Sequence, residues 1–165
     1  MGFAWKPKTE MDFACLHESG HAVVAKAAGC AVNRVMVRQE GEVRIGITDY
    51  QLPTHLSFAP ARAMEIGILH GGKAAESTIA NRDSSRGILQ DQRDIERLIS
   101  QLQMMGPLEF TEGELLEHCD SRARAIVRAN KVAIVKLAKL LSKRGLVEGQ
   151  QLQAILSGVS LPQSA

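Results

Sequence analysis

The chain has 165 residues, a length that suits one domain with a sizeable core. Its formal net charge of +2 is too small to indicate nucleic acid or an anionic membrane as a partner, and an aromatic content of 4% disfavours a base-stacking surface. No apolar run approaches the roughly 20 residues that cross a bilayer, the N-terminus does not resemble a signal peptide, and the sparse cysteines show no paired spacing. We therefore expect a single domain over residues 1–165, cytoplasmic, with no membrane span and no bound nucleic acid.

The first predicted helix runs from about Thr9 to Ala28, with Gly29 as its stop, after a flexible leader over residues 1–9. Its apolar residues recur at three- and four-residue steps, at Phe13, Leu16, Gly20, Val24 and Ala27. A glycine in a helix interior costs roughly 1 kcal/mol relative to alanine. Gly20 therefore indicates that another backbone segment packs close to this helix.

A hairpin is predicted next. Two strand-like segments, residues 33–38 and 43–50, flank the turn over residues 39–42. In the second segment, Val43, Ile45 and Ile47 share one face. Residues 52–58, with Pro53, are expected to form a loop.

The remainder is predicted to be helical. Helices are expected over residues 59–79 and 87–105, and Gly71-Gly72 within the first of them permits tight packing against a neighbour. Thr111 with Glu114 forms a capping-box pattern that opens one long helix to about Arg144. A short helix over residues 148–156 follows, and residues 158–165 are expected to be flexible. The sequence thus predicts a mainly α fold with a small β-hairpin and a long C-terminal helix.

The first predicted helix carries His17-Glu18-Ser19-Gly20-His21, the H-E-x-x-H pattern. On a helix, His17 and His21 lie one turn apart on one face and can bind one Zn²⁺ ion. Glu18 beside them can take a proton from a water at the metal, which then attacks a peptide carbonyl. The competing interpretation is two histidines and a glutamate on an ordinary amphipathic helix.

A catalytic zinc site usually has three protein ligands, so a third must lie elsewhere. Val24 and Ala27 stand where the metzincin pattern needs glycine and histidine, which excludes that class. Glu40 and Glu42 lie in the predicted turn. The other histidines, His55, His70 and His118, are isolated in the sequence. Acids on the middle helices remain, and the residues alone leave the choice open among Glu76, Asp91 and Asp94.

Four segments, in the same order, resemble motifs of one known family. Residues 17–24, His-Glu-Ser-Gly-His-Ala-Val-Val, are close to its His-Glu-Ala-Gly-His-Ala signature. Residues 44–48 resemble the strand next to its active site, residues 71–76 its Gly-Gly-Arg-Ala-Ala-Glu motif, and residues 93–97 its Asn-Asp-Ile-Glu-Arg segment. The chain is therefore similar, along nearly its whole length, to the zinc peptidase domain of the FtsH family of ATP-dependent membrane proteases.

This resemblance implies a complete site. The Zn²⁺ ligands would be His17, His21 and Asp94, with Glu18 as the catalytic base. Glu76 would lie beside the ligands and orient them. The segment before Asp94, residues 88–93, departs from the small, polar run of the family, so Asp91 stays an alternative third ligand.

The resemblance also implies how substrate is bound. An extended polypeptide would pair with the strand over residues 43–50 as an added strand. The residues expected to bind it are Ile45, Gly46, Ile47 and Thr48.

The sequence thus predicts an FtsH-like zinc metalloendopeptidase that hydrolyses peptide bonds in unfolded or flexible proteins. It contains no G-x-x-x-x-G-K-[S/T] phosphate loop. We therefore expect a separate ATPase partner or a homo-oligomer, a hexamer by resemblance. The alternative is a catalytically inactive zinc-binding or helical protein-interaction module. Glu18 argues against it, because a scaffold has no use for a base beside the metal.

Overall fold

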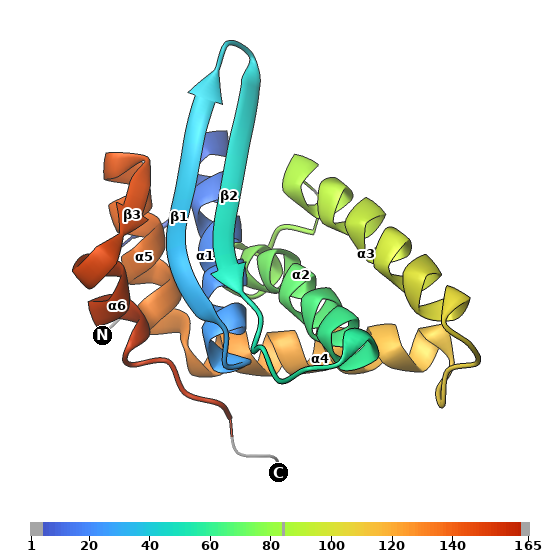
Figure 1. Cartoon of the computed structure of the whole chain (residues 1–165). Coiled ribbons are helices and arrows are strands. Elements are labelled where there is room, and N and C mark those ends of the chain that lie inside the picture. The colour runs from blue at the N-terminus through green and yellow to red at the C-terminus, as the bar shows by residue number, and fades with distance from the viewer. Residues whose placement is uncertain (1–4, 84, 163–165) are drawn as a thin grey trace.

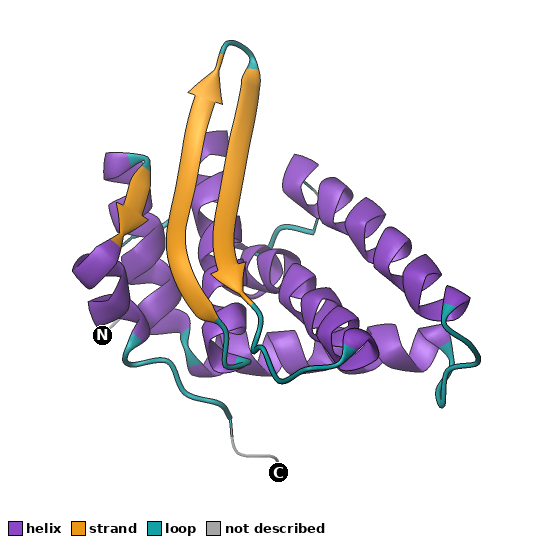
Figure 2. Ribbon diagram, in the orientation of Figure 1, coloured by secondary structure: helices purple, strands orange, loops and turns teal. Residues whose placement is uncertain are grey.

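The computed structural model describes residues 5–83 and 85–162, and helices make up most of this part of the chain (Figure 1). The helices are α1 (Glu10–Ala27), α2 (Phe58–Ala80), α3 (Arg86–Met104), α4 (Glu112–Ala129), α5 (Lys131–Arg144) and α6 (Gly149–Leu156). The strands β1 (Ala31–Glu40), β2 (Val43–Gln51) and β3 (Leu146–Glu148) form an antiparallel sheet in the order β2-β1-β3 (Figure 2). The predicted mainly α class is confirmed.

Helix α1 is the central element of the fold. It begins at a capping box, in which Thr9 Oγ1 accepts from the Asp12 amide at 3.1 Å and Asp12 Oδ2 accepts from the Thr9 amide at 3.2 Å. From Cys15 onward almost every residue is buried, because α2, α5 and the two long strands all pack against α1. The two histidines of the H-E-x-x-H pattern therefore lie within the interior and not on a surface face.

Helices α1 and α2 cross at two glycines. A Cβ added to Gly20 would lie 2.3 Å from the carbonyl oxygen of Gly71, well inside van der Waals contact. The close backbone approach that Gly20 predicted is confirmed, and the neighbour is Gly71 of α2, whereas Gly72 lies against the His17 ring. This crossing brings the middle of α2 against the histidines of α1.

The β1–β2 hairpin projects beyond the helices, as Figure 1 shows. Its turn includes Gly41 at φ 59°, a left-handed conformation that glycine adopts without strain. The ladder runs from Ala31 opposite Gln51 to Glu40 opposite Val43, so both strands are longer than predicted. β1 covers one edge of β2, and within the described residues no strand covers the other edge.

The predicted long C-terminal helix is wrong in one respect, because it breaks into α4 and α5 at Asn130. The buried Asn130 amide nitrogen donates to the Ile126 carbonyl and to the Ser160 carbonyl, both at 2.8 Å, and its oxygen accepts from the Ser160 amide at 2.9 Å. An asparagine side chain that bonds backbone groups competes with helix continuation. These bonds also fix Ser160, within the tail that was expected to be flexible. The rest of the expected flexible ends falls partly on residues 1–4 and 163–165, outside the described residues.

Helix α3 packs mainly against α2 and lies at the opposite end of the molecule from α6 (Figure 1). A second apolar cluster joins it to α2 and α4, through Ile66, Ile95, Leu98, Ile99, Leu102, Leu115 and Cys119. This packing turns one face of α3 toward the histidines of α1. In the described residues, no helix is both long enough and apolar enough to span a bilayer.

Candidate metal centre

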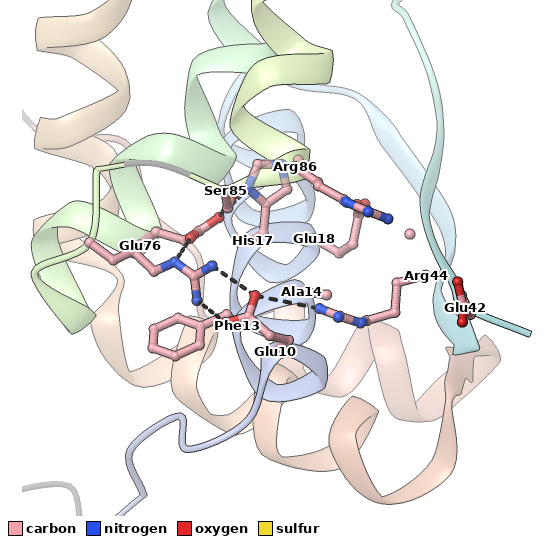
Figure 3. Close-up of a pocket in the computed structure, with 13 residues that line it drawn as sticks. Glu10, Phe13, Ala14, His17, Glu18, Glu42, Arg44, Glu76, Ser85 and Arg86 are labelled. Atoms are coloured by element: carbon pink, nitrogen blue, oxygen red, sulfur yellow. Dashed lines mark hydrogen bonds and ion pairs between the residues drawn. The ribbon is translucent and has the colours of Figure 1, made fainter. Parts of the chain in front are cut away.

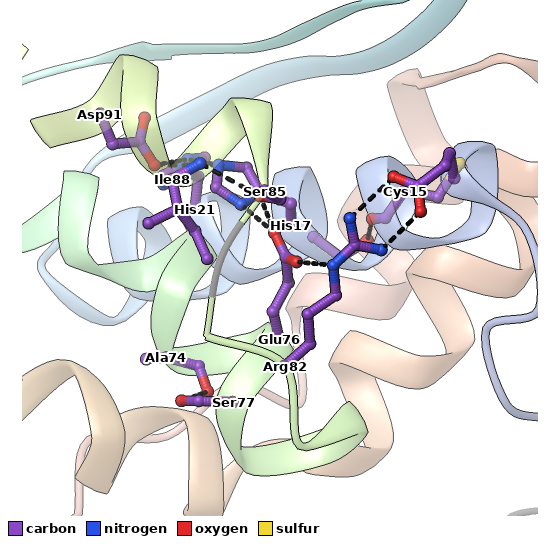
Figure 4. A network of polar contacts seen from close by, with 12 residues as sticks. Cys15, His17, His21, Ala74, Glu76, Ser77, Arg82, Ser85, Ile88 and Asp91 are labelled. Atoms are coloured by element: carbon purple, nitrogen blue, oxygen red, sulfur yellow. Dashed lines mark hydrogen bonds and ion pairs between the residues drawn. The ribbon is translucent and has the colours of Figure 1, made fainter.

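Two histidines of α1 and one aspartate of α3 meet in a buried cluster (Figure 4). His17 Nε2 lies 2.9 Å from His21 Nε2 and 2.9 Å from Asp91 Oδ2, and His21 Nε2 lies 3.1 Å from the same oxygen. The imidazole rings stand nearly perpendicular, at 84°. In the described part of the chain, no other group of three histidine, cysteine or acidic side chains brings its ligand atoms this close together.

The hydrogen-bond partners of the two Nδ1 atoms indicate the tautomer of each histidine ring. His21 Nδ1 lies 2.8 Å from the carbonyl oxygen of Ile68, which can only accept, so Nδ1 is the donor. His17 Nδ1 lies 2.7 Å from Glu76 Oε1 and donates to that carboxylate in the same way. In neutral imidazoles both Nε2 atoms then carry lone pairs. Two such nitrogens and a carboxylate oxygen converge, which is the arrangement that a cation stabilises.

The pKa shifts of the three side chains also indicate that the cluster favours a bound cation. Burial lowers the pKa of His17, but contacts with Asp91 and Glu76 outweigh it and raise the pKa to about 10. Burial lowers the pKa of His21, but the charge and close contact of Asp91 and the charge of Glu18 together outweigh burial and raise it. Burial raises the pKa of Asp91, whereas His21 and His17 hold it well below its usual range. Asp91 Oδ2 nevertheless accepts no well-aligned hydrogen bond from the described residues, although both rings lie within ion-pair distance. The negative charge of Asp91 thus favours a positive charge at the two imidazoles, which a divalent cation bound there would supply.

Asp91 and not Asp94 reaches the histidines. The Asp94 carboxylate contacts Arg97 Nη2 at 3.0 Å and Gln90 Nε2 at 3.3 Å. Three residues along an α-helix correspond to a rotation of about 60° short of a full turn, so the two acids point in different directions. The geometry therefore favours Asp91, the alternative, over the Asp94 that the resemblance implied.

A signal for Asp91 was present in the sequence. The buried positions of α3 are Ile88, Asp91, Ile95, Leu98, Ile99 and Leu102. Asp91 occupies a position of the apolar stripe itself, where an acid needs a positive partner or a metal. The remaining isolated histidines and turn acids lie outside the cluster; His70, for example, is 3.6 Å from Asp120 on α4.

Glu76 lies on α2 directly beside His17 and is only 1% exposed. Besides the His17 nitrogen, its Oε1 accepts a hydrogen bond from the Ser85 hydroxyl at 2.9 Å. The Ser85 oxygen also accepts from the Ile88 amide at 3.2 Å and so caps the N-terminus of α3. Ser85, for which no signal was present in the sequence, thus links Glu76 to α3, the helix that carries Asp91.

Glu18 projects toward β2, where two of the four predicted strand residues contact it. Thr48 Oγ1 donates to Glu18 Oε2 at 2.7 Å and lies 3.1 Å from the Glu18 carbonyl oxygen. A Cβ added to Gly46 would lie 2.2 Å from Glu18 Oε1, so only glycine leaves room for the carboxylate. The strand therefore fixes the orientation of Glu18 next to the cluster.

The cluster opens into a cavity of about 580 Å³ between β2 and α3. Its walls include Ile45 and Ile47 of β2 as well as the three clustered side chains. A second cavity, of about 310 Å³, shares the wall at His17, Glu18 and Gly46 and extends to Glu10 and Phe13 (Figure 3). The hollow beside the uncovered edge of β2 therefore passes along Glu18 and the histidines.

Two histidines one helical turn apart, an aspartate that reaches both of them and an adjacent glutamate are the kinds of side chain that form hydrolytic zinc centres. Comparison with known proteins points the same way. The chain is 42% identical over 74 residues to the ATP-dependent zinc metalloprotease FtsH of Cupriavidus metallidurans. The alignment covers 42% of this chain and only 11% of that protein, and no family model matches the chain. The match suggests a distant, FtsH-like relationship.

Proposed function

We propose that the protein is a zinc-dependent metallopeptidase that hydrolyses peptide bonds in unfolded or flexible polypeptides. The proposal is carried by one observation: three buried lone-pair atoms of His17, His21 and Asp91 converge beside the carboxylate of Glu18. These three residues would hold the zinc ion. The partial similarity to a zinc metalloprotease supports this choice of metal.

The residues around the proposed zinc site then have distinct roles in the reaction. A bound zinc ion would supply Lewis acidity, which acidifies water and polarises a carbonyl. Glu18 accepts the proton of the attacking water and passes it to the departing amine. Thr48 and Gly46 keep the Glu18 carboxylate aligned for both transfers, through the 2.7 Å hydrogen bond and the absence of a Cβ. Glu76 fixes the His17 ring so that Nε2 faces the metal.

The uncovered edge of β2 suits an extended peptide as substrate. Backbone groups of an edge strand can pair with a further strand, and such pairing reads backbone shape more than side-chain identity. We therefore expect cleavage with broad sequence preference and a requirement for unfolded substrate. A separate ATPase that unfolds substrates, or a homo-oligomer such as a hexamer, belongs to the same proposal.

The test compares Glu18→Gln with the wild type for zinc content, by mass spectrometry of the metal, and for chelator-sensitive hydrolysis of casein. Since general-base catalysis contributes about 10²–10⁴-fold, the variant should bind zinc normally and lose at least about 100-fold in rate. Glu117→Gln, an exposed glutamate of α4, is the matched control and should cleave as the wild type does.

Casein hydrolysis by Glu18→Gln at the wild-type rate would show that Glu18 is not the base. A wild-type protein that binds zinc but cleaves no unfolded substrate would instead support the non-catalytic zinc-binding module.

A further inference from the structure

Arg82 follows α2 and contacts both the metal centre and the start of α1. We propose that Arg82 is a positioning residue for the metal centre, which acts on His17 through Glu76. The inference rests on the proposed zinc site and concerns how its ligands are kept in place.

The first contact is with Glu76. Arg82 Nε lies 3.6 Å from Glu76 Oε2, on the side of the carboxylate opposite to His17 and Ser85 (Figure 4). This oxygen accepts no hydrogen bond from the described residues, and the side chain is almost fully buried. A buried carboxylate needs compensation by a nearby positive charge. The Arg82 guanidinium supplies it and restrains the rotation of the carboxylate.

The second contact anchors Arg82 to the helix that bears the histidines. Its Nη1 and Nη2 donate to the two oxygens of Glu10, at 2.9 Å and 2.7 Å. The guanidinium also lies over the Phe13 ring, 4.2 Å from the centroid. Two parallel hydrogen bonds and a stacked ring fix the plane of the arginine guanidinium. A lysine ammonium group has no such plane and could not make the same set of contacts. Arg82 is therefore rigidly oriented on α1.

These contacts form a closed circuit. Glu10, Phe13 and His17 lie on one face of α1, at the spacing of successive helical turns. The circuit runs from His17 to Glu76 on α2 and on to Arg82 (Figure 4), and from Arg82 back to Glu10 on α1. Because Glu76 also binds Ser85 at the N-cap of α3, the same carboxylate links His17 to the helix that carries Asp91. Release of Arg82 should therefore loosen the ligand geometry.

The experiment measures zinc affinity by competition with a chromogenic chelator, and the visible spectrum of the Co²⁺-substituted protein. Groups that orient ligands typically contribute 10–100-fold to metal affinity. We expect Arg82→Gln to weaken zinc binding about 10-fold, at the low end because it acts through Glu76, and to change the Co²⁺ spectrum.

The matched control is Arg62→Gln. Arg62 also pairs with a glutamate, Glu65, and also lies over a phenylalanine ring, at 5.1 Å from the Phe58 centroid, but it lines neither cavity at the cluster. This variant should keep the wild-type zinc affinity and Co²⁺ spectrum. A purely structural role of an arginine–glutamate pair would affect both variants alike.

A double-mutant cycle tests the route through Glu76. If Arg82 acts through that carboxylate, adding Arg82→Gln to Glu76→Gln should cost little further zinc affinity. Glu10→Gln, a change at an exposed position, should weaken zinc binding in the same direction by a smaller factor, and it decides the question if Arg82→Gln fails to fold.

The proposal is overturned if Arg82→Gln and Glu10→Gln both retain the wild-type zinc affinity and Co²⁺ spectrum. It is also overturned if the loss caused by Arg82→Gln is the same with and without Glu76. A lower unfolding temperature without a change in zinc affinity would make Arg82 a fold-stabilising residue only. A wild-type protein that binds no zinc would refute the proposed function instead.

Discussion

Helices α1 and α3 both supply side chains to the candidate metal centre, but the fold positions them in different ways. The two histidines of α1 are four residues apart, so helix geometry alone places them on one face. Helix α1 is enclosed by α2, α5 and the sheet, whereas α3 packs mainly against α2. Asp91 therefore reaches the histidines only through tertiary packing. Because of this difference, we expect the zinc affinity to change whenever α3 shifts relative to α1.

The largest expected effect separates the two aspartates of α3. Asp91→Asn removes the charge that faces both Nε2 atoms, at 2.9 Å and 3.1 Å, and should weaken zinc binding more than about 100-fold, beyond the range for groups that only orient ligands. Asp94→Asn is the matched control and should bind zinc as the wild type does, because its carboxylate contacts Arg97 and Gln90. Chelator competition measures both. The reverse ranking would show that Asp94 is the third ligand and that α3 sits in a different rotation.

The next largest effect concerns Glu18 on α1 and its contact with Gly46 of β2. In Gly46→Ala the new Cβ would approach Glu18 Oε1 to 2.2 Å, so the carboxylate must move while the histidines stay. We expect unchanged zinc content and a fall of about 10–100-fold in kcat for casein hydrolysis, a part of the general-base contribution. Gly113→Ala on α4, where an added Cβ meets open space, should have no effect. Loss of zinc together with activity would mean that β2 positions the ligands as well as the base.

A pH experiment compares the cluster with and without metal. Contacts with Asp91 and Glu76 outweigh burial and raise the pKa of metal-free His17 from 6.5 to about 10. A proton bound more tightly in the folded state stabilises it fully below about pH 6.5, and this contribution is lost as pH rises toward 10. Zinc must displace such protons, so its affinity should fall as pH falls, by up to about tenfold per pH unit for each proton released.

Differential scanning calorimetry between pH 6.5 and pH 9 would measure both sides of this prediction. The free energy of unfolding of the metal-free protein should decrease with rising pH, and the stabilisation added by zinc should increase. Parallel pH profiles for the two forms would contradict proton displacement at the histidines.

The smallest effect tests whether α3 packing sets metal affinity. Ile99→Val on α3 and Ile134→Val on α5 remove the same methyl group from buried positions, and each should lower the free energy of unfolding by about 0.5–1.5 kcal/mol. Only Ile99→Val should also weaken zinc binding, by a few-fold, because Asp91 lies on the same helix. Equal zinc affinities would show that α3 is as firmly positioned as α1.

The same contrast explains how far the sequence predicted the structure. The α1 pattern, the glycine crossing with α2 and the hairpin are encoded in local periodicity and residue size, and all appear in the structure. The three-residue strand β3 is too short to produce a periodic signal, and it exists only because β1 pairs with it. The break at Asn130 depends on bonds to Ser160, thirty residues away.

In the candidate site, too, the local contacts could be predicted from the sequence and the contacts between distant segments could not. His17, Glu18 and His21 could be read from one helical turn, since their spacing alone brings them together. Asp91 reaches these residues only because of how α3 is rotated about its axis where it packs on α2. The helical pattern in the sequence does not define this rotation finely enough to distinguish Asp91 from Asp94. Ser85 and Arg82 join the cluster through contacts with Glu76, and such contacts between distant segments leave no local pattern.

The central claim is that His17, His21 and Asp91 together hold one zinc ion. A crystal structure of the zinc-loaded protein, with anomalous diffraction recorded at the zinc absorption edge, tests it most directly. We predict a single buried anomalous peak about 2.0–2.2 Å from the Nε2 atoms of His17 and His21 and from a carboxylate oxygen of Asp91. A peak bound by Asp94 in place of Asp91, or no peak between the two histidines, would contradict it.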